Sequence, residues 1–275
     1  MLAAERRDAI VNELESKPAV RVAWLAERLG VSDMTIRRDI DALDAAGALI
    51  RVHGGATRAS ALSALEPGFS KNSDRQLTAK KLIAQAASRL IRPGMTIALT
   101  GGTTVYQLAA LLPVQGPLTV LTNSLPAADL LHSLTADRHG GITVLLTGGE
   151  RSPSEALVGP LATAAVRSLN VDICFMGVHG IHPDAGITTP NLAEADTNRA
   201  FAQQCARLVV LADSTKVGVV SLAHIADLSE LNCVVTDGSA EVRPGAAAAA
   251  VDPLAELALH TTLITPDTVP AEEAP

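Results

Sequence analysis

The stretch VSDMTIRRDI, residues 31–40, sets two arginines side by side in a chain whose formal net charge is −7. Ile36, Ile40 and Leu43 recur at the spacing i, i+4, i+7, which predicts one apolar face of a short helix. At about 100° per residue, both arginines then lie away from that face. An isolated helix of this kind is more often a solvated surface helix, so the neighbouring segments have to decide its role.

Those neighbours predict a winged helix-turn-helix. Residues 6–16 and 22–31 are two further apolar-periodic segments, and the second ends at Gly30, just before the first turn of the next helix. Two short helices joined by a tight, Gly-containing turn are typical of the helix-turn-helix. Residues 48–58, ALIRVHGGATR, are rich in β-favouring residues around a Gly-Gly turn and predict a small wing. In such domains the second helix of the pair enters the major groove of DNA.

The basic residues support DNA binding by their position rather than by their number. Residues 1–60 hold nine of the 22 Lys and Arg and nine of the 29 Asp and Glu, so this segment is neutral. Its arginines nevertheless fall on the helix pair and the wing, where phosphates would be met. Which arginine reaches a base and which contacts the backbone stays open. The predicted DNA-contacting residues are Ser32, which can also cap the helix, Met34, Thr35, Arg37, Arg38, Arg51, His53 and Arg58.

Composition places the chain among globular proteins with a large apolar core. It has 275 residues, 48% of them hydrophobic and only 2% aromatic, so packing rests on Ala, Leu, Val and Ile. We expect a soluble, cytoplasmic protein, because the sequence has no run of 18 or more apolar residues and no signal-peptide pattern at Met1. The three cysteines lie far apart in apolar segments and are expected to be reduced thiols.

The remaining chain predicts an α/β domain. Short apolar strands such as MTIALT (95–100), LTVLT (118–122) and VDICFMG (171–177) alternate with helical segments, which is typical of a mostly parallel sheet with helices on both faces. We therefore divide the chain into a winged helix-turn-helix domain at 1–58, a linker at 59–76, an α/β domain at 77–265 and a mobile tail at 266–275.

Small and polar residues follow most of these strands. Glycines let backbone N–H groups approach an anion, a following helix N-terminus favours negative charge, and a lysine adds a point charge for a phosphate. One Gly-Gly-Thr-Thr is more often a simple tight turn, but several such strand ends in one sheet favour a polar ligand site. The predicted effector-binding residues are Gly101, Gly102, Thr103, Thr104, Asn123, Ser124, Gly148, Gly149, Gly177, Ser214 and Lys216.

No cofactor or metal is expected at these loops. The glycine pattern GxGxxG is absent, so a dinucleotide is not favoured. His179 and His182 could suggest a metal pair, but no further Cys or His completes a site, and a loop pair near a pocket mouth is the better interpretation.

Several motifs resemble one known family. TIRRDI followed by LDAAGALIRVHGGA is similar to the N-terminal signature of DeoR-type transcriptional regulators. LTGGTT, LTNSL, LTGGE, MGVHGI, GITTPNLAEADTNRAF and LADSTKVG occur in the order of that family's sensor domain. The resemblance implies a cytoplasmic bacterial regulator whose second domain is similar to ribose-5-phosphate isomerase and CoA-transferase-like folds and senses a phosphorylated sugar or related metabolite. Family members often carry Asp at the position of Thr100 and Lys at that of Asn198, so the effector stays open.

Two classes of function remain. The first is a DNA-binding regulator, a repressor of a sugar operon controlled by a phosphorylated metabolite, acting as a dimer or tetramer without a membrane partner. The second is a sugar-phosphate isomerase-like enzyme with an accessory N-terminal domain. An isomerase needs a positioned carboxylate to move a proton. The candidate loops carry few acids, which favours binding over turnover and a protein that is not an enzyme.

Overall fold

The computed structural model describes residues 3–16, 19–45, 48–52, 55–58, 62–63, 68–112, 116–135, 141–238 and 253–266. The described residues form two compact units, one that ends at Leu62 and one that begins at Ser63. His53, residues 59–61 and 64–67 of the expected linker 59–76, and residues 267–275 of the expected tail lie outside the described residues.

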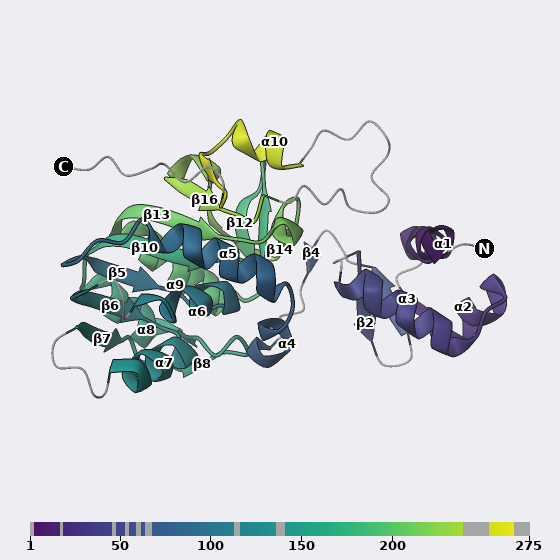
Figure 1. Ribbon diagram of the computed structural model, residues 1–275, viewed down its shortest axis with the longest axis horizontal. Helices are drawn as coiled ribbons and strands as arrows, with labels where there is room; N and C mark the ends of the chain where they lie inside the picture. The colour runs from purple at the N-terminus through teal and green to yellow at the C-terminus, as the bar shows by residue number, and fades with distance from the viewer. Residues whose placement is uncertain are drawn as a thin grey trace. The chain divides into compact units, whose positions relative to one another are not determined.

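The first unit is a winged helix-turn-helix, as predicted (Figure 1). Its helices are α1 (Ala3–Ser16), α2 (Val22–Leu29) and α3 (Asp33–Ala45), and its strands are β1 (Ala19–Arg21), β2 (Leu49–Val52) and β3 (Gly55–Arg58). The strands form an antiparallel sheet in the order β1-β3-β2. Gly30 ends α2 in the left-handed conformation (φ +65°), and its amide donates to the carbonyl of Ala26. Glycine adopts the left-handed conformation at little energetic cost, so the turn into α3 depends on Gly30.

The core of this unit contains the apolar face that the sequence predicts for α3. Ile36, Ile40 and Leu43 are at most 2% exposed. One charged residue is buried with them, which the sequence pattern did not indicate. Asp39 is 3% exposed and accepts hydrogen bonds from Arg6 Nε (2.5 Å) and Arg7 Nε (3.2 Å). The acidic residue of the TIRRD motif therefore attaches α3 to α1.

The second unit is an α/β domain built on one parallel sheet. Its main strands are β5 (Thr96–Leu99), β6 (Leu118–Thr122), β7 (Ile142–Leu146), β10 (Val171–Gly177), β13 (Cys205–Leu211), β16 (Cys233–Val235) and β17 (Leu263–Ile264). Its helices are α4 (Phe69–Ser73), α5 (Leu77–Ser88), α6 (Thr103–Ala109), α7 (Leu125–Thr135), α8 (Pro160–Arg167), α9 (Leu192–Gln203) and α10 (Pro253–Ala258). The sheet order is β17-β16-β13-β10-β5-β6-β7, with every neighbouring pair parallel. The predicted α/β class is confirmed.

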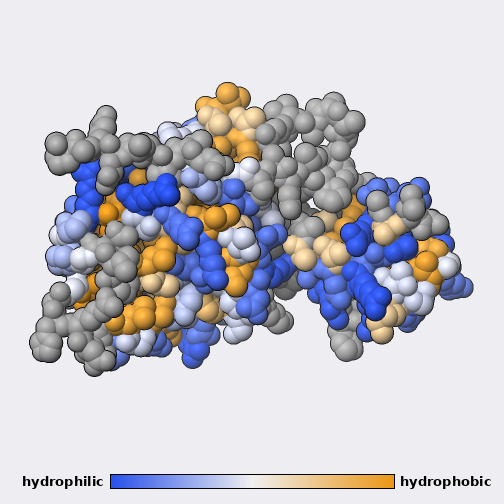
Figure 2. Space-filling model, in the orientation of Figure 1, coloured by the Kyte–Doolittle hydropathy of each residue, from blue (hydrophilic) through white to orange (hydrophobic). Residues whose placement is uncertain are grey.

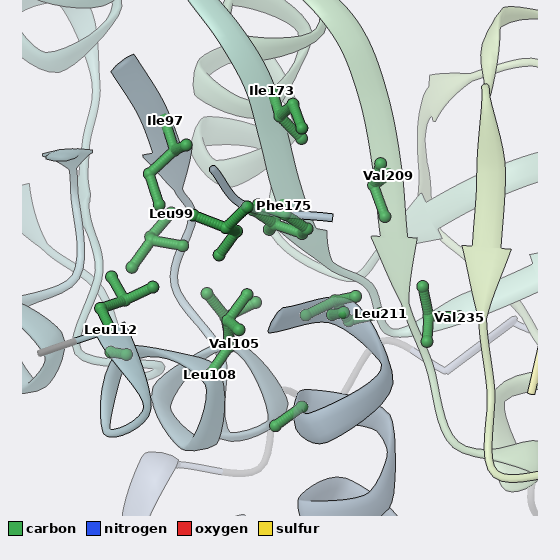
Figure 3. Close-up of a cluster of buried hydrophobic side chains, with 14 of the residues drawn as sticks. Ile97, Leu99, Val105, Leu108, Leu112, Ile173, Phe175, Val209, Leu211 and Val235 are labelled. Carbon is green, nitrogen blue, oxygen red and sulfur yellow. The ribbon is translucent and has the colours of Figure 1, made fainter. Parts of the chain in front are cut away.

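Alternate residues of the central strands pack on opposite faces of this sheet. Ile173 and Phe175 of β10 lie with α5, α6 and α7 on one face. Figure 3 shows both side chains in one cluster with Val105 and Leu108 of α6. Cys174 and Met176 lie on the other face, with α8, α9 and α10. A strand buried on both faces explains the continuous apolar sequence VDICFMG.

Several short strands lie where the sequence pattern predicted loops or no element. These are β4 (Leu62–Ser63), β8 (Glu150–Arg151), β9 (Leu157–Val158), β11 (Gly180–His182), β12 (Gly186–Thr189), β14 (Val220–Ser221) and β15 (Ala223–Ala226). The strands β8 and β9 form a hairpin, and β11, β12 and β15 form a small antiparallel sheet. Two to four residues carry too little periodicity to be recognised as a strand.

Candidate functional sites

The outer face of α3 carries exposed side chains on a capped helix. The amide of Thr35 donates to Ser32 Oγ (3.2 Å), and the two hydroxyls lie 2.9 Å apart, so Ser32 caps the helix. Arg37 and Arg38 are exposed, and within the described part of the chain neither has an ion-pair partner. Met34 is 61% exposed beside them. In Figure 2 the visible face of this unit is mainly hydrophilic, with smaller hydrophobic areas.

The base of the wing is bound to the same helix. The guanidinium of Arg51 pairs with Asp41 of α3, and the Arg51 amide donates to Asp44 Oδ1 (3.1 Å). Arg51 is therefore held beside α3, with its charge partly balanced. Arg58 closes β3, whereas His53 lies outside the described residues.

The strand order of the second unit defines a topological switch point. The chain runs outward from β5 through β6 to β7, then returns so that β10 pairs with the other side of β5. In open parallel sheets, ligands bind at the carboxyl ends of the strands where the order reverses. Gly101 and Gly102 follow β5, and Gly177 ends β10, so the sheet brings these predicted residues together.

Hydrogen bonds hold the loops of this crevice in place. The amide of Gly177 donates to Thr100 Oγ1 (3.1 Å), and the amide of Gly101 donates to Asn123 Oδ1 (3.0 Å). Asn123 is 1% exposed, and its Nδ2 donates to the carbonyl of Leu157 (3.0 Å). Asn123 thus joins the loop after β5 to the hairpin β8–β9. Its proposed contact with a ligand stays a prediction.

Close packing explains why Gly101, in the loop after β5, is a glycine. A Cβ built at Gly101 would lie 2.6 Å from the Cβ of Ala156, which is too close for any side chain. Gly102 has φ +132°, a conformation that L-residues rarely adopt. The loop therefore requires glycines for its own structure, whatever it binds.

The other predicted residues are distributed over three places. Thr103 and Thr104 open α6 directly after the glycines, and Ser124 is buried and accepts from the amide of Ala127 (3.3 Å). Gly148 and Gly149 follow β7, which β6 separates from β5. A Cβ built at Gly149 would lie 2.6 Å from the carbonyl oxygen of Val158, so this glycine packs against the hairpin β8–β9. The proposed ligand contact of these two glycines stays a prediction.

Two cations, Arg75 and Lys80, interact with the predicted Lys216 and were not indicated by the sequence motifs. Lys80 of α5 is only 4% exposed, and its ammonium donates to the carbonyl of Asn72. Burial lowers the pKa of Lys80 to about 8; Asp213 opposes the shift, and Lys216 and Arg75 add to it. Arg75, Lys80 and Lys216 therefore lie close enough for their charges to interact. We call these three residues the cation cluster.

Lys216 interacts electrostatically with several groups around it. Burial lowers the pKa of Lys216, with Asp213 opposing and Arg75 contributing. His179, two residues after β10, has its pKa lowered to about 3, first by burial and then by Lys216 and Arg75. It is therefore a neutral imidazole at pH 7. Ser214 is bound to a carboxylate, since its amide donates to Asp237 Oδ1 (2.8 Å) and its hydroxyl to Oδ2 (3.3 Å).

One signal in the sequence could have revealed Lys80. Ile83, Ala84 and Ala87 follow it at i+3, i+4 and i+7 and are buried, so a lysine interrupts the apolar face of α5. Buried lysines are rare unless they are paired or functional. Clustered cations beside a glycine-lined crevice can bind a dianionic group such as a phosphate. Fold and sites together define a winged helix-turn-helix protein with an α/β ligand-binding domain.

Comparison with known proteins identifies the family. Residues 6–61 match the DeoR-like helix-turn-helix domain, and residues 75–238 match the DeoR C terminal sensor domain. The chain belongs to the DeoR family of DNA-binding transcriptional regulators, which confirms the resemblance seen in its sequence.

Curated relatives match over most of their length. The HTH-type transcriptional regulator GlpR of Haloferax volcanii is 32% identical, over 87% of this chain and 91% of the relative. The lactose phosphotransferase system repressor of Staphylococcus aureus is 35% identical, over 85% of this chain and 91% of the relative. The HTH-type transcriptional regulator GolR of Listeria innocua is 33% identical, over 86% and 91%.

Solved structures match this chain with TM-scores below 0.5. The ribose 5-phosphate isomerase A of Methanocaldococcus jannaschii has a TM-score of 0.36 and 17% identity, covering 50% of this chain and 52% of that one. The translation initiation factor eIF-2B of Pyrococcus horikoshii OT3 has a TM-score of 0.43 and 14% identity, covering 84% and 86%. Within the described residues, no helix has both the length and the apolar character to cross a membrane.

Proposed function

We propose that this regulator represses a sugar operon and that a phosphorylated sugar or related metabolite controls its binding to operator DNA. The observation that carries the effector half is the cation cluster of Arg75, Lys80 and Lys216 beside the β5–β10 crevice. Guanidinium and ammonium groups bind phosphate through charge-assisted hydrogen bonds. A relative named as a lactose phosphotransferase system repressor supports the link to sugar metabolism.

Within the crevice, the phosphate is assigned to the cation cluster and the sugar to the neighbouring loops. Gly101, Gly102, Thr103 and Thr104 would offer backbone and hydroxyl donors. Asn123 and Ser124 would face sugar hydroxyls, together with the backbone at Gly177. Because the loops after β5 and β10 meet at one edge of the sheet, their donors can face one ligand.

The DNA half of the function is assigned to α3 and the wing. The exposed Arg37 and Arg38 would reach a base edge and a phosphate, and Arg51 and Arg58 would contact the backbone. A single winged helix makes few contacts, so we propose a homo-oligomer, at least a dimer, that binds two half-sites. We place this regulator in the cytoplasm, where its DNA is.

We propose binding of the effector without turnover. An aldose–ketose isomerase needs a carboxylate within reach of the substrate's carbon-bound proton. Asp213, the carboxylate that acts most strongly on Lys80, is 2% exposed and accepts from the amide (3.2 Å) and hydroxyl of Thr215. It balances the lysines and is not free to act as a base.

The test uses the full-length protein and a duplex selected from random DNA by the wild type. A panel of triose, pentose and hexose phosphates, with the unphosphorylated sugars as comparison, is titrated by calorimetry and gel shift. We expect at least one phosphorylated sugar to bind and to change DNA affinity.

Two lysine variants give this test its contrast. Lys216→Ala should abolish the response to the sugar phosphate and leave DNA affinity without it nearly unchanged, whereas Lys81→Ala, at an exposed site on α5, should retain both. The proposal is wrong if no phosphorylated sugar binds, or if one binds and is converted at an enzyme-like rate.

A further inference from the structure

The short helix α4 (Phe69–Ser73) has a particular position along the chain. It is the first helix described after the segment that follows the winged helix-turn-helix, and α5 with its Lys80 comes directly after it. It thus lies on the N-terminal connection between the winged helix-turn-helix and the α/β domain. Figure 1 shows α4 next to α6, and the contacts between elements agree.

The first contact of α4 is with the cation cluster. The ammonium of Lys80 donates to the backbone carbonyl of Asn72, in the last turn of α4. A phosphate that approaches Lys80 attracts the same ammonium group. Binding of an anion and the present position of α4 therefore depend on one shared cation.

The second contact is with the helix that begins at the predicted sugar-binding loop. The ring of Phe69 packs edge-to-face against Tyr106, with centroids 5.6 Å apart and an interplanar angle of 83°. Tyr106 belongs to α6, whose first residues are Thr103 and Thr104. A shift of that loop on binding a sugar would move the partner of Phe69.

The third contact is with the hairpin that Asn123 holds in place. The amide of Phe69 donates to the carbonyl of Pro153 (3.2 Å), between β8 and β9. On the same hairpin, the amide of Leu157 donates to the carbonyl of Asn123 (2.6 Å). Three separate segments of the effector site thus contact one helix of five residues.

We propose that α4 transmits occupancy of the effector site to the winged helix-turn-helix. This inference rests on the proposed function. A ligand shifts an equilibrium only by its different affinity for two arrangements. Here the two arrangements differ in whether Lys80 binds the carbonyl of Asn72 or the phosphate. Phe69 is a positioning residue, because it couples α4 to α6 and to the hairpin without touching the ligand.

The decisive variant is Phe69→Leu, which keeps an apolar side chain and removes the ring contact. We expect its affinity for the best-binding sugar phosphate of the panel to stay within a few-fold of wild type. Wild type should change its DNA affinity with this compound by a factor in the usual range of about 5–150, and the variant by less than about two. Tyr106→Phe, which retains the ring, is the matched control and should respond like wild type.

A second measurement does not depend on a variant. Hydrogen exchange of the wild-type protein is followed with that sugar phosphate, with inorganic phosphate and without either. The amides of Phe69 and Asn72, which donate to Pro153 and Gly68, should change their exchange when the sugar phosphate is bound.

The outcomes separate the two proposals. If Phe69→Leu binds the sugar phosphate and still responds like wild type, or if exchange in α4 is unchanged while DNA affinity changes, the role of α4 is wrong. If no sugar phosphate binds wild type or alters its DNA affinity, the proposed function itself fails.

Discussion

The amide of Gly177 donates to Thr100 Oγ1 over 3.1 Å, although the two residues are 77 positions apart in the sequence. Thr100 directly follows β5 and is fully buried, and Gly177 is the last residue of β10. Beyond this point the two strands separate towards different loops. The Thr100 hydroxyl thus accepts the hydrogen bond that a strand carbonyl would otherwise accept, and it links the ends of β5 and β10 at the crevice.

Replacing Thr100 by Val should therefore weaken the second unit. Valine has nearly the same shape but no acceptor, so the amide of Gly177 loses its partner, at a cost of about 1–3 kcal/mol. Thermal unfolding of the full chain followed by calorimetry measures the loss, and Thr100→Ser, which keeps the hydroxyl, serves as control. A Thr100→Val protein as stable as wild type would show that this hydrogen bond contributes little.

Removing Asp39 should destabilise the winged helix-turn-helix. Asp39→Ala leaves Arg6, whose side chain is 12% exposed, without its carboxylate, and breaking a buried pair in this way costs about 3–5 kcal/mol. DNA binding should then fall together with helix content at moderate temperature. Asp33→Ala, at an exposed position of the same helix, should change both far less. Normal folding and DNA binding of Asp39→Ala would refute the structural role.

Arg37 and Arg38 should dominate sequence-specific DNA binding. Alanine at a base-reading arginine should cost about 1–3 kcal/mol and relax specificity, whereas alanine at a phosphate contact should weaken all sequences alike and lower the salt dependence. Footprinting on the selected duplex at several salt concentrations distinguishes the two roles. Unchanged affinity in both variants would exclude this face of α3.

The pair between Arg51 and Asp41 predicts a gain of affinity. Both side chains are about half exposed, so their ion pair contributes little to stability. Asp41→Asn should free Arg51 for a phosphate, strengthen DNA binding and steepen its salt dependence by about one charge. In the Arg51→Ala background the same change should have a smaller effect. Weaker binding of Asp41→Asn would mean that the pair positions the wing.

The lysines make effector binding depend on pH. Burial lowers the pKa of Lys80 from 10.5 to about 8. Between these two pH values, Lys80 is therefore deprotonated in the folded protein and protonated in the unfolded chain. Affinity for a sugar phosphate should therefore fall as pH rises through about 8. For the same reason, this lysine makes stability rise with pH between the two pKa values. The lowered pKa of Lys216 acts in the same direction.

Calorimetry between pH 7 and 9 measures this dependence. Lys80→Arg should flatten it, because a guanidinium keeps its proton in proteins. An affinity that does not vary across this range in wild type would place the phosphate away from the lysines.

Local patterns were sufficient for much of this protein. Ile36, Ile40 and Leu43 gave α3 its inner face, and that periodicity depends only on residues within three turns of helix. The alternation of apolar strands with helices likewise predicted the parallel sheet, because a strand buried on both faces must be apolar throughout. The family resemblance came from motifs such as TIRRDI and LADSTKVG, which are contiguous in the chain.

Only the tertiary structure decided which residues meet. The order of the strands placed β10 beside β5, and this joined Gly177 to Thr100. The charge interaction of Lys80 with Lys216 has the same origin, since α5 and the segment after β13 meet only after the sheet and its helices have packed. Short-range periodicity reports whether a side chain is buried. It carries no information on which distant segment buries it.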